Sequence, residues 1–410
     1  MKRVVITGVG ALSPLGHDWP TVRECLRAKR NVVQYLQAWD GYEGLNTRLG
    51  VPVAPFELPA ETYTRKTTRS MGRVAVMAVR ASEMALSAAG LLDAPLLKSG
   101  QMGVSYGSSV GSPAAIGDFA NMITRKTTEG ITATTYIKMM SHTAAVNIGV
   151  FFGLTGRIIP TSSACTAGSQ GIGYAFEAIQ SGRQVAMLAG GAEELDAIDA
   201  AVFDTLFATS TANDTPQLTP RPFDAHRDGL VLGEGACTLV LEELEHAKAR
   251  GARILGEIIG FGTNSDGTHV TQPSAGTMAA AMRLALAGAG LQPGDIGYIN
   301  AHGTATDHGD VAESNATAQV FGASVPISTL KSYMGHTLGA CGALEAWMTL
   351  EMMRDGWFAP TINLSEVDPR CGNLDYIIGD GRAIDTNIVM SNNFAFGGIN
   401  TSLILRRWTE

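Results

Sequence analysis

No stretch of about 18 uninterrupted apolar residues occurs in this chain, so the sequence predicts no membrane-spanning helix. The opening residues, Met1 to Ile6, briefly mimic a signal peptide. Gly8, Gly10 and Pro14 soon interrupt the apolar run, and no cleavage-type site stands out. We therefore expect the chain to begin with a β-strand of the folded protein.

Cysteine is scarce, and its pattern argues against a disulfide framework. The chain has five cysteines, an odd number, and no two of them have CxxC spacing. Disulfide-stabilised secreted domains and structural zinc sites both need paired or regularly spaced cysteines. We therefore expect a reduced, cytoplasmic protein, with buried structural roles for Cys25, Cys237, Cys341 and Cys371.

Charge is also sparse, at 17% of the residues, and the formal net charge is −8. Nucleic-acid-binding proteins usually carry a basic face, so this balance argues against nucleic acid as a partner. The 45% share of hydrophobic residues argues against disorder and allows a large core. A length of 410 residues suggests two or three domain-sized units.

Short apolar strands alternate with helical segments, which predicts an α/β fold with a mostly parallel sheet covered by helices. We expect strands at residues 4–8, 102–106, 157–161, 185–190, 253–260, 296–300, 388–391 and 401–406, with 157–161 buried. Helices are expected at 21–29, 69–89, 166–178, 278–290 and 338–354, and a strand leading into a short helix at 239–250.

The pattern restarts near residue 250 without a low-complexity linker. We therefore expect two halves of similar architecture, residues 1–250 and 251–410, that share one large interface. The halves show no sequence repeat, so their similarity is a structural prediction.

The segment from Thr161 to Ser169 places Cys165 between an apolar strand and a helix start. Unpaired backbone N–H groups and the helix dipole favour an anion at such a place, so the thiol is expected to have a lowered pKa and to react as a thiolate. The small neighbouring residues would let a thioester approach. A buried structural cysteine is the simpler alternative.

Two histidines lie next to glycine residues. His302 ends an apolar strand beside Gly303 and is expected to project into a cleft of the sheet. His336 precedes an Ala/Gly-rich helix, whose start would favour a neutral imidazole that can donate to an oxyanion. Lys331 lies before His336, and Glu345 lies along the helix after it. The alternatives are satisfied buried histidines and a surface lysine.

The segment Phe394 to Asn400 combines two aromatic residues with two glycines, which indicates a turn that can move or offer a backbone N–H. A tight hairpin with two core phenylalanines is the alternative. Taken together, the cysteine, the two histidines and the lysine indicate nucleophilic acyl chemistry. A cysteine hydrolase fits the same residues.

The motifs together resemble those of the elongating β-ketoacyl-acyl carrier protein synthases. The matching segments are Ser163-Ala-Cys165-Thr-Ala-Gly, Asn300-Ala-His302-Gly-Thr-Ala-Thr306, Lys331-Ser-x-x-Gly-His336, Asn392-x-Phe-x-Phe396-Gly-Gly-x-Asn400, Arg221-Pro-Phe-Asp224 and Gly233-Glu-Gly-Ala236. The resemblance runs in order from residue 3 to about 406. It implies a thiolase-like fold of two similar halves in five layers, α-β-α-β-α, and a homodimer or a heterodimer with a related subunit.

The resemblance also implies a reaction. An acyl group passes from an acyl carrier protein to Cys165, malonyl on a second carrier protein loses its carboxyl group, and the resulting enolate attacks the acyl thioester to give a 3-oxoacyl product. The synthase itself would need no cofactor, because phosphopantetheine is carried by the partner carrier protein. The product would belong to fatty acid, polyketide or polyene biosynthesis.

Site roles follow from the resemblance residue by residue. Cys165 is the implied nucleophile, His302 and His336 stabilise the enolate, and Lys331 and Glu345 form the polar network behind His302. The remaining implied roles are an oxyanion hole from the backbone N–H groups of Cys165 and Phe396, pantetheine binding by Thr304 and Thr306, an acyl pocket with Val110 and Phe394, gating by Phe396, and a structural monovalent cation near Asn300, Glu345 and Asn392.

Basic residues stand out against the acidic chain and suggest where an acidic carrier protein would dock. They are Arg65, Lys66, Arg69, Arg125 and Lys126. Solvated surface charge without a partner is the alternative.

Some positions depart from the family pattern. Asn393-Phe394-Ala395-Phe396 replaces the usual Ser-Phe-Gly-Phe, and the methyl group of Ala395 would restrict movement of the gate. Thr132 to Thr135 is polar where fatty-acid enzymes often carry aromatic residues near the dimer seam. A polyketide or polyene synthase therefore fits as well as a fatty-acid enzyme.

Three relatives of the same fold fit the residues less well. An inactive scaffold subunit of a ketosynthase heterodimer would lack the nucleophile, whereas Cys165 is present. Chalcone-type synthases use Cys-His-Asn, which His336 contradicts. Thiolases use two cysteines, and Cys341 and Cys371 lie outside the expected context of the second.

Overall fold

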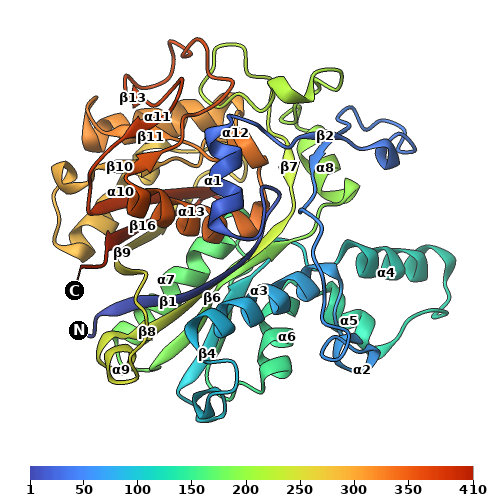
Figure 1. Ribbon diagram of the computed structural model, residues 1–410. Coiled ribbons are helices and arrows are strands. Elements are labelled where there is room, and N and C mark those ends of the chain that lie inside the picture. The colour runs from blue at the N-terminus through green and yellow to red at the C-terminus, as the bar shows by residue number, and fades with distance from the viewer. Residues whose placement is uncertain (410) are drawn as a thin grey trace.

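The computed structural model describes residues 1–409, and in it eleven strands form one continuous sheet (Figure 1). The N-terminal half contributes β1 (Val4–Leu12), β4 (Met102–Gly107), β5 (Ile158–Pro160), β6 (Ala186–Glu193) and β8 (Gly235–Glu243). The C-terminal half contributes β9 (Gly256–Ser265), β10 (Tyr298–Asn300), β11 (Pro326–Ser328), β13 (Asp375–Tyr376), β15 (Ile388–Ala395) and β16 (Ile399–Arg407).

The two halves of the sheet repeat one strand order. The order is β5-β4-β6-β8-β1 in the first half and β11-β10-β15-β16-β9 in the second, with β13 added at the outer edge. If the five shared strands of each half are numbered along the chain, both orders read 3-2-4-5-1. The halves meet where Val4 to Ile6 of β1 pair with β9. The expectation of two similar halves is therefore confirmed in spite of the missing sequence repeat.

Helices complete five layers, α-β-α-β-α, as the resemblance implied. α3 (Arg73–Ala89) and α6 (Thr143–Phe152) cover the N-terminal half, and α10 (Ala275–Ala289) and α11 (Asp307–Phe321) belong to the outer layer of the C-terminal half (Figure 1). α7 (Ala167–Gln180) and α13 (Cys341–Asp355) form the middle layer and contact strands of both halves. α13 is buried nearly all round, as expected of a central helix.

The expectation of a mostly parallel sheet is wrong. The outer strand pairs are parallel, but the central run from β15 through β16, β9, β1 and β8 to β6 is antiparallel throughout. Some of these strands follow one another through a short turn, such as residues 396–398 between β15 and β16, and a turn of this kind forces antiparallel pairing.

The first strand is longer than expected. It was predicted to end in a glycine-rich turn at Gly8, but β1 passes through Gly8 and Gly10 to Leu12. A Cβ atom at Gly8 would overlap the carbonyl oxygen of Ala85, and one at Gly10 that of Ala81. The glycines therefore let the backbone of α3 lie directly on the strand.

Most of the remaining predicted elements are present, with boundaries shifted by a few residues. Strand β5 was predicted to be buried, which is wrong, because it is the edge strand of the sheet and Ile158 is 44% exposed. Further elements surround this framework: α1 (Trp19–Arg27), α2 (Arg65–Thr68), α4 (Pro113–Arg125), α5 (Ala133–Met139), α8 (Ala197–Asp204), α9 (Leu244–Ala249), α12 (Lys331–Met334) and the 3-10 turns η3 (Ala164–Thr166) and η6 (Leu338–Ala340).

The connection between α9 and β9 lies between Ala249 and Gly256, and we propose residues 250 and 251 as the boundary of the halves. Within residues 1–409, no helix is both long enough and apolar enough to cross a bilayer.

Candidate active site

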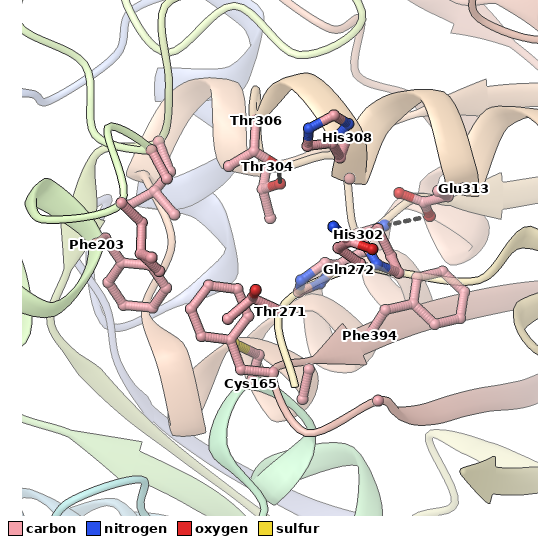
Figure 2. A pocket seen from close by; sticks show the side chains of 18 of the residues that line it. Cys165, Phe203, Thr271, Gln272, His302, Thr304, Thr306, His308, Glu313 and Phe394 are labelled. Carbon is pink, nitrogen blue, oxygen red and sulfur yellow. Dashed lines mark hydrogen bonds between the residues drawn. The ribbon is translucent and has the colours of Figure 1, made fainter. Parts of the chain in front are cut away.

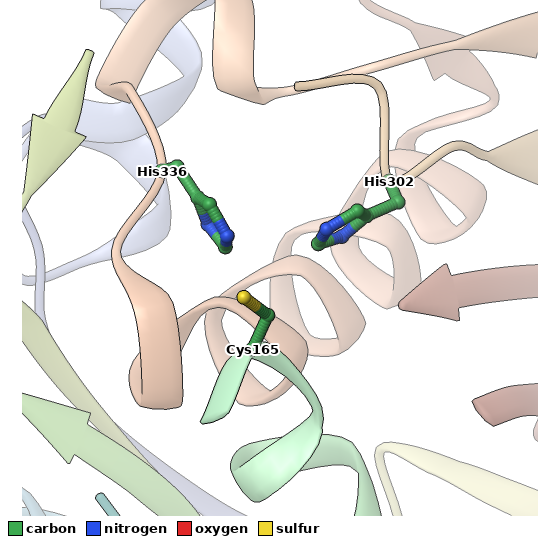
Figure 3. A group of neighbouring side chains, drawn as sticks. All are labelled: Cys165, His302 and His336. Carbon is green, nitrogen blue, oxygen red and sulfur yellow. The ribbon is translucent and has the colours of Figure 1, made fainter. Parts of the chain in front are cut away.

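A cavity of about 430 Å³ contains Cys165, His302 and His336 in its lining (Figure 2). The three side chains come from both halves of the fold: the cysteine from the start of α7, and the histidines from loops that follow β10 and α12. In Figure 3 the thiol and both imidazoles point toward one another. The Sγ atom of Cys165 and one ring nitrogen of each histidine all lie within 4.8 Å of one another. The structure thus brings together the three residues predicted to carry the chemistry.

Cys165 lies in the turn η3, directly before α7. The preceding residue, Ala164, has φ of +49°, an uncommon value for a residue with a Cβ, and this turns the chain sharply into the helix. The expected low pKa is wrong. Burial raises the pKa of the Cys165 thiol to about 12, although Lys331 and the backbone N–H groups of Phe396 and Cys165 act to lower it. The resting thiol is therefore protonated at neutral pH.

The two histidines are buried, and their rings lie 5.0 Å apart at a right angle. Burial lowers the pKa of both well below the usual value, and the nearby positive charge of Lys331 lowers it further. His336 is therefore neutral, as expected, but for a different reason from the predicted helix start. Neither ring nitrogen of His336 has a hydrogen-bond partner in residues 1–409. Two neutral imidazoles thus face the thiol.

The loop that carries His302 is held by two carboxylates of α11. Glu313 accepts from the backbone N–H groups of His302 and Gly303, both at 2.7 Å. Asp310 accepts from the N–H groups of Thr304 and Ala305 at 3.0 and 3.1 Å. Four consecutive N–H groups are therefore satisfied by two buried side chains. Neither acid was predicted from the sequence to support the site.

Lys331 and Glu345 form an ion pair in which neither side chain is exposed. The alternative of a surface lysine is therefore excluded. Asn393 of β15 donates to the second carboxylate oxygen of Glu345 at 2.7 Å, and its Nδ2 lies 3.4 Å from His302 Nδ1. The polar network behind His302 contains the two residues expected there and Asn393, which was noted only as a departure from the family pattern.

The turn after β15 brings Phe396 to the cavity. Its ring centre lies 5.0 Å from that of Phe203. Its backbone N–H hydrogen-bonds to the thiol of Cys165 and so acts to lower the pKa of that thiol. Gly397 and Gly398 have φ of +86° and +70°, values that favour glycine. Gly397 N–H donates to the carbonyl of Val270 at 2.8 Å, which ties the turn to a loop on the cavity rim.

Other predicted substrate-binding residues divide into two groups. Thr304, Thr306 and Phe394 line the cavity, and the two threonine hydroxyls are 2.9 Å apart (Figure 2). Val110 is not part of the lining. Its backbone N–H instead hydrogen-bonds to the buried carboxylate of Glu193.

The polar run Thr132 to Thr135, which forms the N-cap and first turn of α5, has a local structural reason. The hydroxyl of Thr132 accepts from the N–H of Thr135, and that of Thr135 accepts from the N–H of Thr132, which forms a capping box. The polarity of this segment therefore follows from the start of a helix and need not report on the substrate.

The predicted cation site contains unpartnered oxygens. Asn300 Oδ1 and Asn392 Oδ1 are buried and have no hydrogen-bond partner in residues 1–409. Carbonyl oxygens of this kind suit a hard cation, whereas the carboxylate of Glu345 is already shared by Lys331 and Asn393. The two asparagines therefore fit a cation better than the glutamate does.

The five basic residues predicted to dock a carrier protein are exposed, and none has an ion pair with a carboxylate of residues 1–409. None of them lines the cavity. They are Arg65 and Lys66 of α2, Arg69 after it, and Arg125 and Lys126 at the end of α4.

Comparison with known proteins finds relatives that match this chain over its whole length. Residues 1–247 match the family model described as beta-ketoacyl synthase, N-terminal domain, and residues 255–365 match the C-terminal domain of the same family. The 3-oxoacyl-(acyl-carrier-protein) synthase 2 of Synechocystis sp. is 36% identical over 99% of this chain and 98% of that protein. The solved beta-ketoacyl synthase of Burkholderia phymatum STM815 is 61% identical with a TM-score of 0.98, and the ishigamide ketosynthase/chain length factor is 32% identical with a TM-score of 0.89; each match covers 100% of both chains.

Proposed function

The chain belongs to the β-ketoacyl synthase family, and from this premise we propose that Cys165, His302 and His336 carry out its acyl transfer and decarboxylative condensation. The protein is a 3-oxoacyl-acyl carrier protein synthase, an acyltransferase. The observation that supports the residue roles is the convergence of the thiol and two neutral imidazoles within 4.8 Å in one cavity.

Acyl transfer begins with the protonated thiol of Cys165. Its proton passes to a neighbouring imidazole as the sulfur attacks the thioester carbonyl of the acyl carrier protein. The imidazole then gives that proton to the sulfur of pantetheine, which leaves as the thiol. The backbone N–H groups of Cys165 and Phe396 both hydrogen-bond to the sulfur, so they are near enough to bind the oxyanion that forms on the carbonyl oxygen when the sulfur attacks the carbonyl carbon. The product of this half-reaction is an acyl thioester on Cys165.

Condensation uses the two histidines. Malonyl on a second carrier protein loses its carboxyl group as carbon dioxide, and the electron pair of the broken bond forms an enolate on the thioester oxygen. Neutral imidazole N–H groups of His302 and His336 stabilise that oxygen, and removal of one such donor typically costs about 3–4 kcal/mol. The enolate carbon then attacks the acyl carbonyl carbon, and Cys165 leaves as the thiolate, which takes up one proton from solvent.

Thr304 and Thr306 are proposed to bind the pantetheine arm, and Phe394 and Phe396 to contact the acyl chain, because all four line the cavity. Val110 would contact the acyl chain only beyond the cavity that surrounds the thiol. The carrier protein supplies the phosphopantetheine, so the proposal needs no further cofactor. Asn300 and Asn392 would hold a structural cation, and the basic residues of α2 and α4 would attract the acidic carrier protein.

The edge strand β5 supports a dimer. Its outer backbone groups have no strand partner within residues 1–409, and an unpaired edge readily accepts another strand. Ile158 of β5 is 44% exposed, and Val150 of α6, which contacts β5, is 74% exposed. We propose that two copies of the chain pair through β5. A heterodimer with a related subunit is the alternative, since the ishigamide protein is described as a ketosynthase/chain length factor.

The protein is proposed to act in the cytoplasm, because all five cysteines are free thiols.

The proposed condensing activity can be tested directly. Purified protein is incubated with acyl carrier proteins of several chain types and with malonyl carrier protein, and products are followed by intact mass spectrometry with Cys165→Ala as the control. A 3-oxoacyl product two carbons longer, formed by the wild type only, supports the proposal and identifies the fatty acid, polyketide or polyene chain type. Acylation without elongation would indicate a missing partner subunit, and no acylation with any donor would overturn the assignment.

A further inference from the structure

Asn393 lies within reach of three buried groups of the active site. Its Nδ2 donates to Glu345 Oε2 at 2.7 Å and lies 3.4 Å from His302 Nδ1 and 3.6 Å from Cys341 Sγ. The side chain is fully buried, and its amide oxygen has no hydrogen-bond partner within residues 1–409. Strand pairing with β16 and a hydrogen bond from the hydroxyl of Thr401 to the carbonyl of Asn393, at 3.0 Å, hold its backbone in place.

Glu345 determines which end of the Asn393 amide faces His302. Lys331 Nζ is paired with Oε1 of Glu345, so the carboxylate carries negative charge and its other oxygen can only accept a hydrogen bond. The amide oxygen of Asn393 would be repelled at that place, whereas the NH2 group is attracted. The same NH2 group therefore lies against the ring of His302.

A neutral imidazole has one nitrogen with a proton and one without. One N–H of the Asn393 amide is directed at Glu345, and the other is shared between Nδ1 of His302 and the more distant Sγ of Cys341, which favours the ring form in which Nδ1 is bare. The single proton must then lie on Nε2. No other side chain of residues 1–409 is hydrogen-bonded to the His302 ring, so Asn393 is the hydrogen-bond partner that favours one tautomer.

We propose that Asn393 is a positioning residue that fixes the Nε2–H tautomer of His302. The inference rests on the proposed function, in which His302 donates an N–H to the enolate oxygen. Nε2 is the nitrogen left for the cavity, so this tautomer turns His302 into a permanent donor. His336 differs, because both of its ring nitrogens lack a partner in the described residues, and its tautomer is free to follow the substrate.

The tautomer is measured directly by ¹⁵N NMR of the whole protein labelled at histidine, without substrate. The His302 signals are identified by their loss in His302→Gln. We expect the wild type to show a protonated Nε2 and a bare Nδ1. A protonated Nδ1 in the wild type would overturn the proposal, whether or not any variant folds.

The variant Asn393→Leu keeps a similar volume and removes the donor. We expect a mixture of His302 tautomers, a fall in condensation of about 10- to 100-fold, and acylation of Cys165 within about twofold of wild type, because only condensation uses the His302 donor. Cys341→Ala removes the other neighbour of the amide and should leave the tautomer unchanged. An unchanged tautomer in Asn393→Leu would contradict the proposal. Failure of the proposed function would appear differently, as a wild type that does not condense.

Discussion

Lys331 Nζ and Glu345 form an ion pair at the centre of the protein, and neither side chain has any exposed surface. An isolated charge at such a place is strongly unfavourable, so each residue depends on the other. The pair lies next to the amide that contacts His302, which joins the stability of the fold to the geometry of the site.

Removal of one partner of this pair should destabilise the fold. We expect Glu345→Gln or Lys331→Met to lower the free energy of unfolding by about 3–5 kcal/mol, because each leaves an uncompensated buried charge. Urea unfolding followed by fluorescence measures the change. The partly exposed pair Arg382–Asp375 is the control, and Asp375→Asn should cost at most about 1 kcal/mol. Equal losses at both pairs would contradict the interpretation.

The reactivity of Cys165 should rise steadily with pH. Because burial raises the thiol pKa to about 12, the thiolate fraction of the free enzyme grows about tenfold for each pH unit from pH 7 to 9.5. The rate of alkylation by iodoacetamide, measured at each pH by intact mass and corrected with Cys165→Ala, should follow that fraction. A plateau below pH 8 would indicate a low-pKa thiolate.

Much of the fold could be predicted because its strands are short, apolar and separated by helices. The strand at 102–106 and the helix that ends at Gly90 are examples in which local residues determine the element. The antiparallel centre of the sheet could not be predicted, because pairing direction depends on which strands become neighbours. The path of β1 through Gly8 depends likewise on the backbone of α3, a contact that no local pattern contains.

The candidate site shows the same division. The nucleophile and both histidines could be named from strand ends, glycines and the family motifs. The pKa of Cys165 could not, because the loss of solvent around the thiol is a property of the folded protein. Asp310 and Glu313 were missed as supports of the His302 loop, because two acids in a polar helix usually face solvent.

The two histidines should act in condensation far more than in acylation. We expect His302→Ala and His336→Ala each to lower the condensation rate by about 10²- to 10³-fold, since each removes one donor to the enolate oxygen. Acyl transfer to Cys165 should survive in His302→Ala, because His336, whose ring nitrogens have no hydrogen-bond partner within residues 1–409, can still accept the thiol proton. Stopped-flow quenching with mass spectrometry separates the two steps. Equal loss of both steps in both variants would argue against the assigned roles.

Charge at the exposed edge strand should break the proposed dimer. Wild-type protein is expected at twice the chain mass of 43.0 kDa in analytical ultracentrifugation. The double variant Ile158→Lys with Val150→Lys places two charges in the interface and should sediment as a monomer at micromolar concentration. Leu284→Lys, an exposed apolar residue on α10 of the other half, is the control and should remain a dimer. A monomeric wild type would point to a different subunit as the partner.

The basic residues of α2 and α4 should affect only reactions that involve the whole carrier protein. Electrostatic attraction acts on the encounter with an acidic partner, whereas a short pantetheine thioester carries no such surface. Changing Arg65, Lys66 and Arg69 together to Ser should lower kcat/KM for acyl carrier protein by roughly 10-fold at low salt, and the difference from wild type should shrink as ionic strength rises.

Two controls separate docking from damage to the site. With an acyl pantetheine thioester, the variant and the wild type should give the same kcat/KM. A matched triple change of the partly exposed Arg354, Arg382 and Arg407, which lie in the C-terminal half, should leave both values near those of wild type. An equal loss with both substrates would instead indicate damage to the active site, and no loss with either would leave these residues as solvated surface charge.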